Sequence, residues 1–260
     1  MFPTKRKDTA MPITTNVVMI HGLMGSLSYF EPQKRVPDLR WLTPDLPGYG
    51  ATPMQDGGEG FSLRGQAEHV RDLILNLDEG PCWVLGHSVG GAIAMMLAEA
   101  HPELVRGLIS VEGNFTLNDA FWCRKVAAMS VSEWRASYSE MQSDPEAWLT
   151  RAEIEPTVER LEWARRILVN QSTDTVHAVA NAVVRETAGA EYQDSIRRVV
   201  DSGLPLYLLS GERSDAGWDV PEYVRATALQ SVRQKNTGHM MMLEAPDEFC
   251  AIVADFIRFS

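Results

Sequence analysis

The chain has 260 residues, 45% of them hydrophobic and 23% charged, a balance that can bury the core of one catalytic domain with an insertion, or of two small domains. Its formal net charge of −11 repels phosphate backbones and anionic lipid, so nucleic acid and membranes are poor candidate partners. The segment at residues 1–8 is basic, but no apolar run long enough for a secretory signal or a membrane span follows it, and we predict a cytoplasmic protein. Three scattered cysteines without CxxC spacing favour reduced thiols over a disulfide framework or a zinc site.

Short apolar runs alternate with helical patterns in the first half of the chain, which is typical of βαβ units around a parallel sheet. The predicted strands cover residues 16–20, 40–43, 82–85, 104–111, 205–210 and 232–236. The predicted core helices cover residues 62–77, with Ser62 as the N-terminal cap, and then 89–100, 221–229 and 246–259.

Strand patterns disappear between residues 113 and 202, where helical spacing dominates. We therefore predict a helical lid at 113–202, inserted into a core formed by residues 1–112 and 203–260. This segment is rich in aromatic and methionine side chains, some of which we expect to face the site and shape an apolar pocket. They are Phe115, Phe121, Trp122, Met129, Trp134, Met141 and Trp148.

The strongest chemical signal is Gly86-His87-Ser88-Val89-Gly90, which fits the pattern G-x-S-x-G between a predicted strand and a predicted helix. Such a turn holds its serine in a strained conformation that exposes the hydroxyl. Side chains two residues before and after it would clash with the neighbouring strand and helix, so glycine is needed at both places. The pattern predicts Ser88 as a nucleophile.

With these residues the chain resembles the α/β-hydrolase superfamily, in its lid-bearing branch. Residues 21–25 (HGLMG) resemble the family's oxyanion loop, and residues 45–52 (DLPGYGAT) resemble the turn after its fourth strand. Residues 238–239 (GH) and 243–246 (LEAP) resemble its C-terminal histidine block. The resemblance implies a mostly parallel sheet with helices on both faces. Because few residues precede the first predicted strand, we expect about six or seven strands. It implies no metal and no organic cofactor.

The same resemblance implies an oxyanion hole made by the backbone amides of Leu23 and Val89. The Val89 amide also opens a helix, whose dipole favours negative charge. His21 is expected to orient the oxyanion loop and not to act as a base.

His239 is the predicted general base, because it follows a strand, lies in a glycine-containing loop and comes last in the order serine, acid, histidine. The other histidines lie in predicted helices, at a helix end, in the elbow or in the oxyanion loop. They are His21, His69, His87, His101 and His177.

Two carboxylates compete to be the acid that orients His239. Most of the family places it in a G-x-x-D pattern, where this chain has Ser214, with Asp215 one residue late. A minority places it after the strand that follows the nucleophile helix, where this chain has Glu112. We favour Glu112 and keep Asp215 as the alternative, because a carboxylate directly after a buried strand needs a partner.

These residues predict a serine hydrolase that cleaves a carboxylic ester, or a related acyl bond, of a small and largely apolar substrate through an acyl-serine intermediate. Hydrolysis of a carbon–carbon bond, thioester cleavage and acyl transfer are alternatives within the same fold. A ligand-binding protein with an inactive site is an alternative of another class. The sequence leaves the substrate's identity and the oligomeric state open.

Overall fold

The computed structural model describes residues 15–54 and 61–260, and the basic segment at residues 1–8 lies outside this part. Its centre is a six-stranded sheet in the order β2-β1-β3-β4-β5-β6, and every neighbouring pair is parallel. The predicted size and type of sheet are confirmed. The strands are β1 (Thr15–Ile20), β2 (Leu39–Leu42), β3 (Cys82–His87), β4 (Val105–Val111), β5 (Leu206–Gly211) and β6 (Gln230–Gln234).

The central strands are apolar along nearly their whole length because helices cover both faces of the sheet. All residues of β3 and β5 are buried, whereas the edge strand β6 is largely exposed. The buried strands therefore appear in the sequence as continuous apolar runs, which is why their positions could be predicted within one or two residues.

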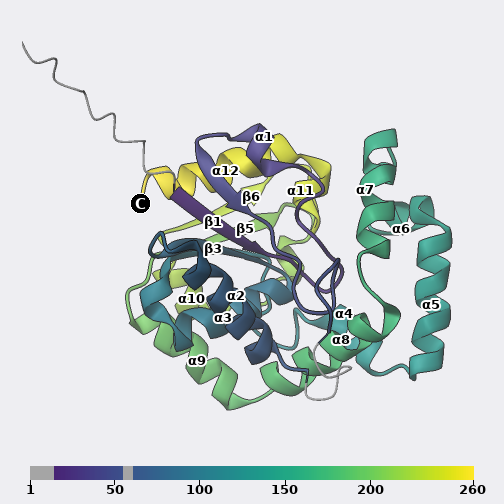
Figure 1. The fold of residues 1–260 in the computed structure, drawn as a ribbon, viewed down its shortest axis with the longest axis horizontal. Coiled ribbons are helices and arrows are strands. Elements are labelled where there is room, and N and C mark those ends of the chain that lie inside the picture. Colours follow the sequence, from purple (N-terminus) through teal and green to yellow (C-terminus); the bar gives the residue numbers. More distant parts are fainter. Residues whose placement is uncertain (1–14, 55–60) are drawn as a thin grey trace, which may run out of the picture.

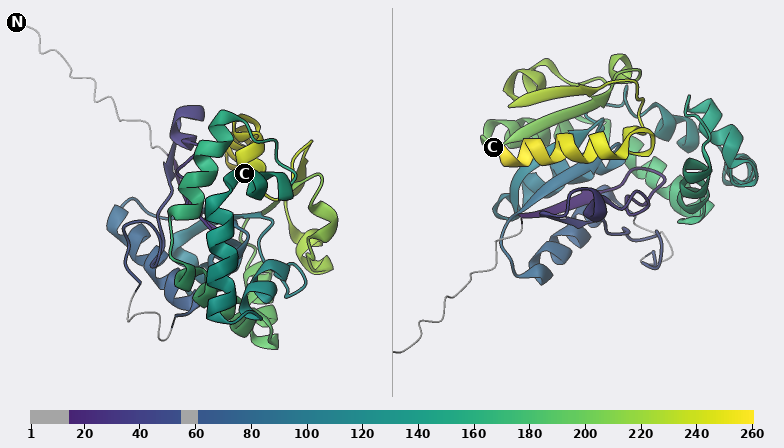
Figure 2. Two further views of the ribbon diagram at one scale, coloured as in Figure 1. Left: turned by 90° about the vertical axis from the view of Figure 1, so that its right-hand side faces the viewer. Right: turned by 90° about the horizontal axis from the view of Figure 1, so that it is seen from above.

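Helices form a layer on each face of the sheet (Figures 1 and 2). One layer contains α2 (Leu63–Leu77), α3 (Val89–Ala100), α9 (Ala190–Asp201) and α10 (Glu222–Thr227). The other contains α1 (Pro32–Arg35), α11 (Met241–Glu244) and α12 (Pro246–Arg258). Ser62 caps α2 by accepting a hydrogen bond from Gly65 N at 2.9 Å, as predicted.

A run of helices between β4 and β5 stands beyond one end of the sheet (Figures 1 and 2). It contains α4 (Phe121–Ala127), α5 (Val131–Ser143), α6 (Pro145–Arg151), α7 (Val158–Val169) and α8 (Thr173–Thr187). We call α4–α8 the insert. Helix α9, which the sequence groups with the predicted lid, packs against α3 beside the sheet.

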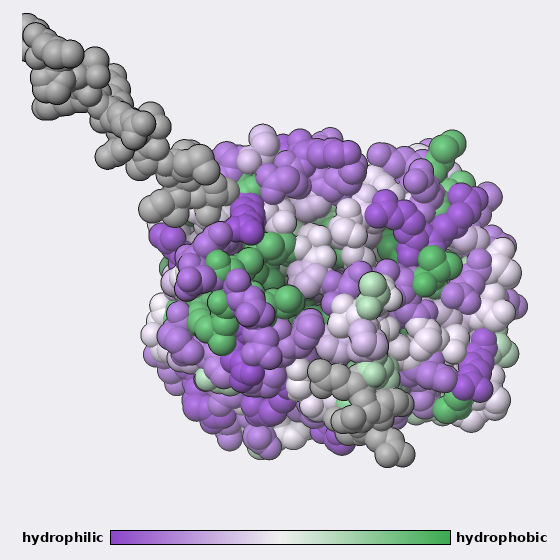
Figure 3. Space-filling view, in the orientation of Figure 1, coloured by the Kyte–Doolittle hydropathy of each residue, from purple (hydrophilic) through white to green (hydrophobic). Residues whose placement is uncertain are grey.

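The surface in Figure 3 is mostly hydrophilic, with apolar residues in separate patches, as on most globular proteins. In the part of the chain that the structure describes, no helix is both long enough and apolar enough to cross a membrane.

Candidate active site

The loops after β1 and β3 meet at the point where the strand order reverses, which is the usual position of a ligand site in an open parallel sheet. The chain runs from β1 outward to β2, and then crosses back to β3 on the other side of β1. In the paired strands Ile20 lies opposite Gly86, so the two loops leave the sheet side by side. A Cβ atom at Gly22 would lie only 3.1 Å from Ser88 Cβ.

Ser88 occupies a strained turn between β3 and α3. Its backbone has φ 54° and ψ −122°, a conformation that residues other than glycine rarely adopt. A Cβ at Gly86 would lie 2.3 Å from Gly90 O, and one at Gly90 would lie 2.2 Å from Ile20 O. These backbone clashes confirm the predicted need for glycine on both sides of the serine.

His21 fixes the loop that carries the Leu23 amide. Leu46 N donates to His21 Nε2 at 3.2 Å, so the ring proton lies on Nδ1, which donates to Gly22 O at 2.9 Å. Because the C=O and N–H of a trans peptide point in opposite directions, this bond turns the Leu23 N–H away from the ring. Tyr49 Oη donates to Leu23 O at 2.8 Å and holds the next peptide. Burial lowers the pKa of His21, which keeps the ring neutral.

His239 and Glu112 come from loops after different strands and form a short hydrogen bond. His239 Nδ1 donates to Glu112 Oε2 at 2.6 Å. The His239 side chain is 45% exposed, whereas that of Glu112 is only 5% exposed. In the described part of the chain no hydrogen bond joins Ser88 to His239, and catalytic hydrogen bonds of this kind often tighten only when substrate binds.

Glu112 is itself held by donors from β5 and the loop after it. Its backbone has φ 41°, and its Oε1 accepts from Gly211 N at 2.8 Å and from Ser214 Oγ. Burial acts to raise the pKa of this carboxyl, but the hydrogen bond from His239, helped by those from Ser214 and Gly211, leaves it below its ordinary value of 4.5. Glu112 is therefore ionised at neutral pH.

The competing carboxylate, Asp215, is engaged elsewhere. Its Oδ1 accepts from Ser210 Oγ at 2.7 Å, and its Oδ2 lies 3.4 Å from Arg233 Nε. Ser214, which occupies the place where the family usually has its acid, donates its hydroxyl to Glu112. The geometry thus brings Glu112, and not Asp215, to His239.

His87 supports the His239 loop, a contact that the sequence did not predict. Its Nε2 lies 3.0 Å from His239 O, and the two rings pack with centroids 4.6 Å apart. Because a carbonyl only accepts, Nε2 carries the proton. Burial and the neighbouring His239 lower the pKa of His87 to about 3, so it stays neutral. The middle letters of a G-x-S-x-G pattern carry no signal that could have indicated this contact.

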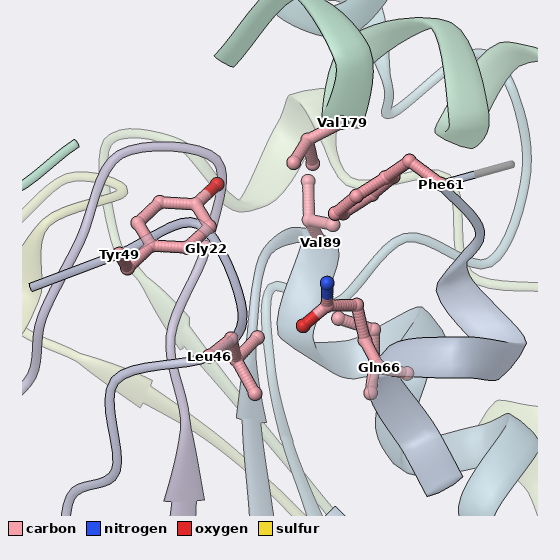
Figure 4. Close-up of a pocket in the computed structure, with 8 residues that line it drawn as sticks. Gly22, Leu46, Tyr49, Phe61, Gln66, Val89 and Val179 are labelled. Atoms are coloured by element: carbon pink, nitrogen blue, oxygen red, sulfur yellow. The ribbon is translucent and has the colours of Figure 1, made fainter. Parts of the chain in front are cut away.

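A crevice too narrow to hold a water molecule lies beside the elbow (Figure 4). Its wall includes Gly22, which lies against Ser88 in space, and Val89, which follows Ser88 in the sequence. Val179 of the insert closes it from above in Figure 4. The other lining residues are Leu46, Tyr49, Phe61, Gln66 and Ile93. Among the described residues that line this crevice there is none of the seven aromatic and methionine residues expected to face the site. Trp134 and Trp148 are instead buried, while Phe121 is 60% exposed.

The insert is tied to the oxyanion loop by the turn between α7 and α8. Asn170 Nδ2 donates to Gly25 O at 2.6 Å and to Asp45 Oδ1 at 2.9 Å. Gly25 N in turn donates to Gln171 Oε1 at 3.2 Å. These long-range polar contacts place the insert over the loops that follow β1 and β2. They leave no local pattern in the sequence and were not predicted.

Comparison with known proteins gives relatives over nearly the whole chain. The chain is 27% identical over 248 residues to the 2-succinyl-6-hydroxy-2,4-cyclohexadiene-1-carboxylate synthase of Enterobacter sp. (strain 638), covering 93% of this chain and 91% of the relative. It is 26% identical over 267 residues to the pimeloyl-[acyl-carrier protein] methyl ester esterase of Yersinia enterocolitica, covering 94% of each. The solved thermophilic esterase from Thermogutta terrifontis has the same fold, with a TM-score of 0.71 and 22% identity over 94% of this chain and 89% of that one.

A family model described as "Alpha/beta hydrolase family" matches residues 17–252. The match covers most of β1, the other five strands, the elbow and the histidine loop. Together with the esterases among the relatives, it supports a hydrolase of this fold. The chain belongs to the alpha/beta hydrolase family.

Proposed function

We propose that the protein is a serine hydrolase that cleaves a carboxylic ester of a small, largely apolar acyl group through an acyl-serine intermediate. Ser88 is the nucleophile, His239 the general base and Glu112 the acid of the triad. The observation that carries this proposal is the 2.6 Å hydrogen bond between His239 Nδ1 and the buried Glu112 carboxylate. The loop that carries His239 contacts His87, which precedes Ser88 in the strained turn.

The reaction follows from the roles of these groups. His239 Nε2 takes the proton of Ser88 Oγ as this oxygen attacks the ester carbonyl, and the Leu23 and Val89 amides donate to the oxyanion that forms. The imidazolium then gives its proton to the departing alcohol, and the C–O bond breaks to leave acyl-Ser88. Water, deprotonated by His239, then attacks the acyl carbonyl; the bond from the acyl carbon to Ser88 Oγ breaks, His239 returns the proton to Oγ, and the acid leaves. Glu112 keeps Nε2 free to accept a proton and stabilises the imidazolium.

Hydrolysis is favoured over transfer to another acceptor because solvent reaches the base. The His239 side chain is 45% exposed, so water has direct access to it. Carbon–carbon bond hydrolysis and thioester cleavage need the same groups and remain alternative reactions of the same site. The cytoplasmic location also remains a proposal.

Labelling with a fluorophosphonate tests the proposal and separates an enzyme from a ligand-binding protein. We expect stoichiometric modification of the wild-type chain and none of Ser88→Ala, with hydrolysis of p-nitrophenyl esters reduced by several orders of magnitude in the variant. Ser231→Ala, a change on the exposed edge strand β6, is the matched control and should behave as wild type. Hydrolysis by Ser88→Ala within tenfold of the wild-type rate would refute the assignment.

A further inference from the structure

One polar side chain breaks the apolar wall of the crevice beside Ser88. Gln66 lies on α2, on the same buried face as Leu63, Ala67 and Val70, and is only 4% exposed. Its amide group points into the space between Leu46 and Val89 (Figure 4). A buried amide in such a position costs free energy unless both its ends find hydrogen-bond partners.

Within residues 15–54 and 61–260, only one end of the Gln66 amide has a partner. Nε2 donates to Pro47 O at 3.3 Å. Because a carbonyl oxygen accepts and never donates, this contact assigns the nitrogen to Pro47 O and makes Oε1 the end of the amide that has no partner. Several buried side-chain oxygen atoms lack a partner in the described part of the chain, and of these only Gln66 Oε1 belongs to a residue that lines the crevice.

We propose that Gln66 Oε1 is a specificity determinant that accepts a hydrogen bond from a hydroxyl or amide N–H on the acyl group of the substrate. The inference rests on the proposed function, because two lining residues adjoin the candidate nucleophile: a Cβ at Gly22 would lie 3.1 Å from Ser88 Cβ, and Val89 follows Ser88 in the chain. The acyl group enters between α2 and α8, and its donor lies against Gln66. The substrate is then an ester of a hydroxy acid or an acylamino acid and not of a plain fatty acid. Since the crevice does not hold even a water molecule as it stands, the proposal requires that lining side chains such as Phe61 and Val179 shift to admit the acyl group.

Esters of matched chain length test this directly. We compare kcat/KM for p-nitrophenyl hexanoate with that for the 3-hydroxyhexanoate, 6-hydroxyhexanoate and N-propanoylglycinate esters. A plain chain leaves Gln66 Oε1 buried and unpaired, so we expect the wild-type enzyme to prefer at least one donor-bearing ester by about tenfold or more. Gln66→Met keeps the length of the side chain and removes its acceptor, and should bring this ratio close to one.

Gln234→Met is the matched control. Gln234 is also buried, also donates Nε2 to a backbone carbonyl, at 3.0 Å from Ala245 O, and also has an unpaired Oε1, but it does not line the crevice. Its substitution should leave the donor preference unchanged. A wild-type enzyme that prefers hexanoate to every donor-bearing ester, or a preference that survives in Gln66→Met, would overturn the inference.

The result also separates this inference from the proposed function. If p-nitrophenyl hexanoate is hydrolysed in a Ser88-dependent way without any donor preference, the inference fails and the proposed function stands. If wild type and Ser88→Ala hydrolyse all four esters alike, the proposed function fails and takes the inference with it. If Gln66→Met does not fold, the wild-type ratio alone decides.

Discussion

The identity of the triad acid can be tested by two amide substitutions. In Glu112→Gln, the backbone N–H of Gly211 still needs an acceptor at the Oε1 position, so the new carbonyl oxygen stays there and the NH₂ group faces His239 Nδ1. Nδ1 must then accept, which places the ring proton on Nε2, where it cannot take the proton of Ser88. A wrong tautomer of this kind lowers kcat by about 10⁴, which is about 5 kcal/mol of transition-state stabilisation.

Asp215→Asn is the matched control. Its Oδ1 can still accept from Ser210, and the lost charge faces Arg233, whose side chain is 69% exposed, so we expect kcat within about threefold of wild type. Steady-state hydrolysis of p-nitrophenyl esters by both variants decides the question, with circular dichroism to show that each is folded. A kcat that falls by orders of magnitude in Asp215→Asn but stays near the wild-type value in Glu112→Gln would refute the reasoning.

Three further predictions concern packing, positioning and pH. A Cβ at Gly91 would lie 2.3 Å from Gly113 Cα in the loop after β4, so Gly91→Ala should lower the free energy of unfolding by about 2 kcal/mol or more. A Cβ at Gly217 would meet no atom within 4 Å, so Gly217→Ala should leave the free energy of unfolding unchanged. Urea unfolding measures both variants. Asn170→Ala removes the donor to Gly25 O and should lower kcat about tenfold by loosening the oxyanion loop, with KM little changed; an unaltered kcat would contradict this. Because the folded-state pKa of Glu112 lies below 4.5, its stabilising contribution is complete above that pH and is lost as the pH falls through the lowered pKa. The difference in unfolding free energy between wild type and Glu112→Gln should therefore shrink in acid, and a constant difference would contradict the assignment.

The sheet and the elbow could be predicted because their signals are local. Buried parallel strands give continuous apolar runs, and the clash at Gly86 and Gly90 restricts those positions to glycine whatever the distant sequence is. Helix α3 was therefore predicted with its observed bounds, Val89–Ala100.

The supporting contacts could not be predicted because they join residues far apart in sequence. Nothing near Ser214 indicates that its hydroxyl binds Glu112, and nothing near Asn170 indicates a bond to Gly25. The helical pattern of α2 likewise places Gln66 among apolar neighbours without showing that its oxygen lacks a partner. The aromatic content of the insert indicated a pocket wall, but Trp134 is buried among the helices of the insert itself.

The acyl-serine intermediate is the central claim, and it can be trapped. We would mix the enzyme with p-nitrophenyl hexanoate, quench the reaction in acid before the first turnover ends, and locate the added hexanoyl mass by peptide mass spectrometry. The account predicts that it is found on Ser88 in wild-type enzyme, in step with the first release of p-nitrophenol, and on no residue of Ser88→Ala. Turnover with no acyl group on Ser88, or with the acyl group on a different side chain, would contradict it.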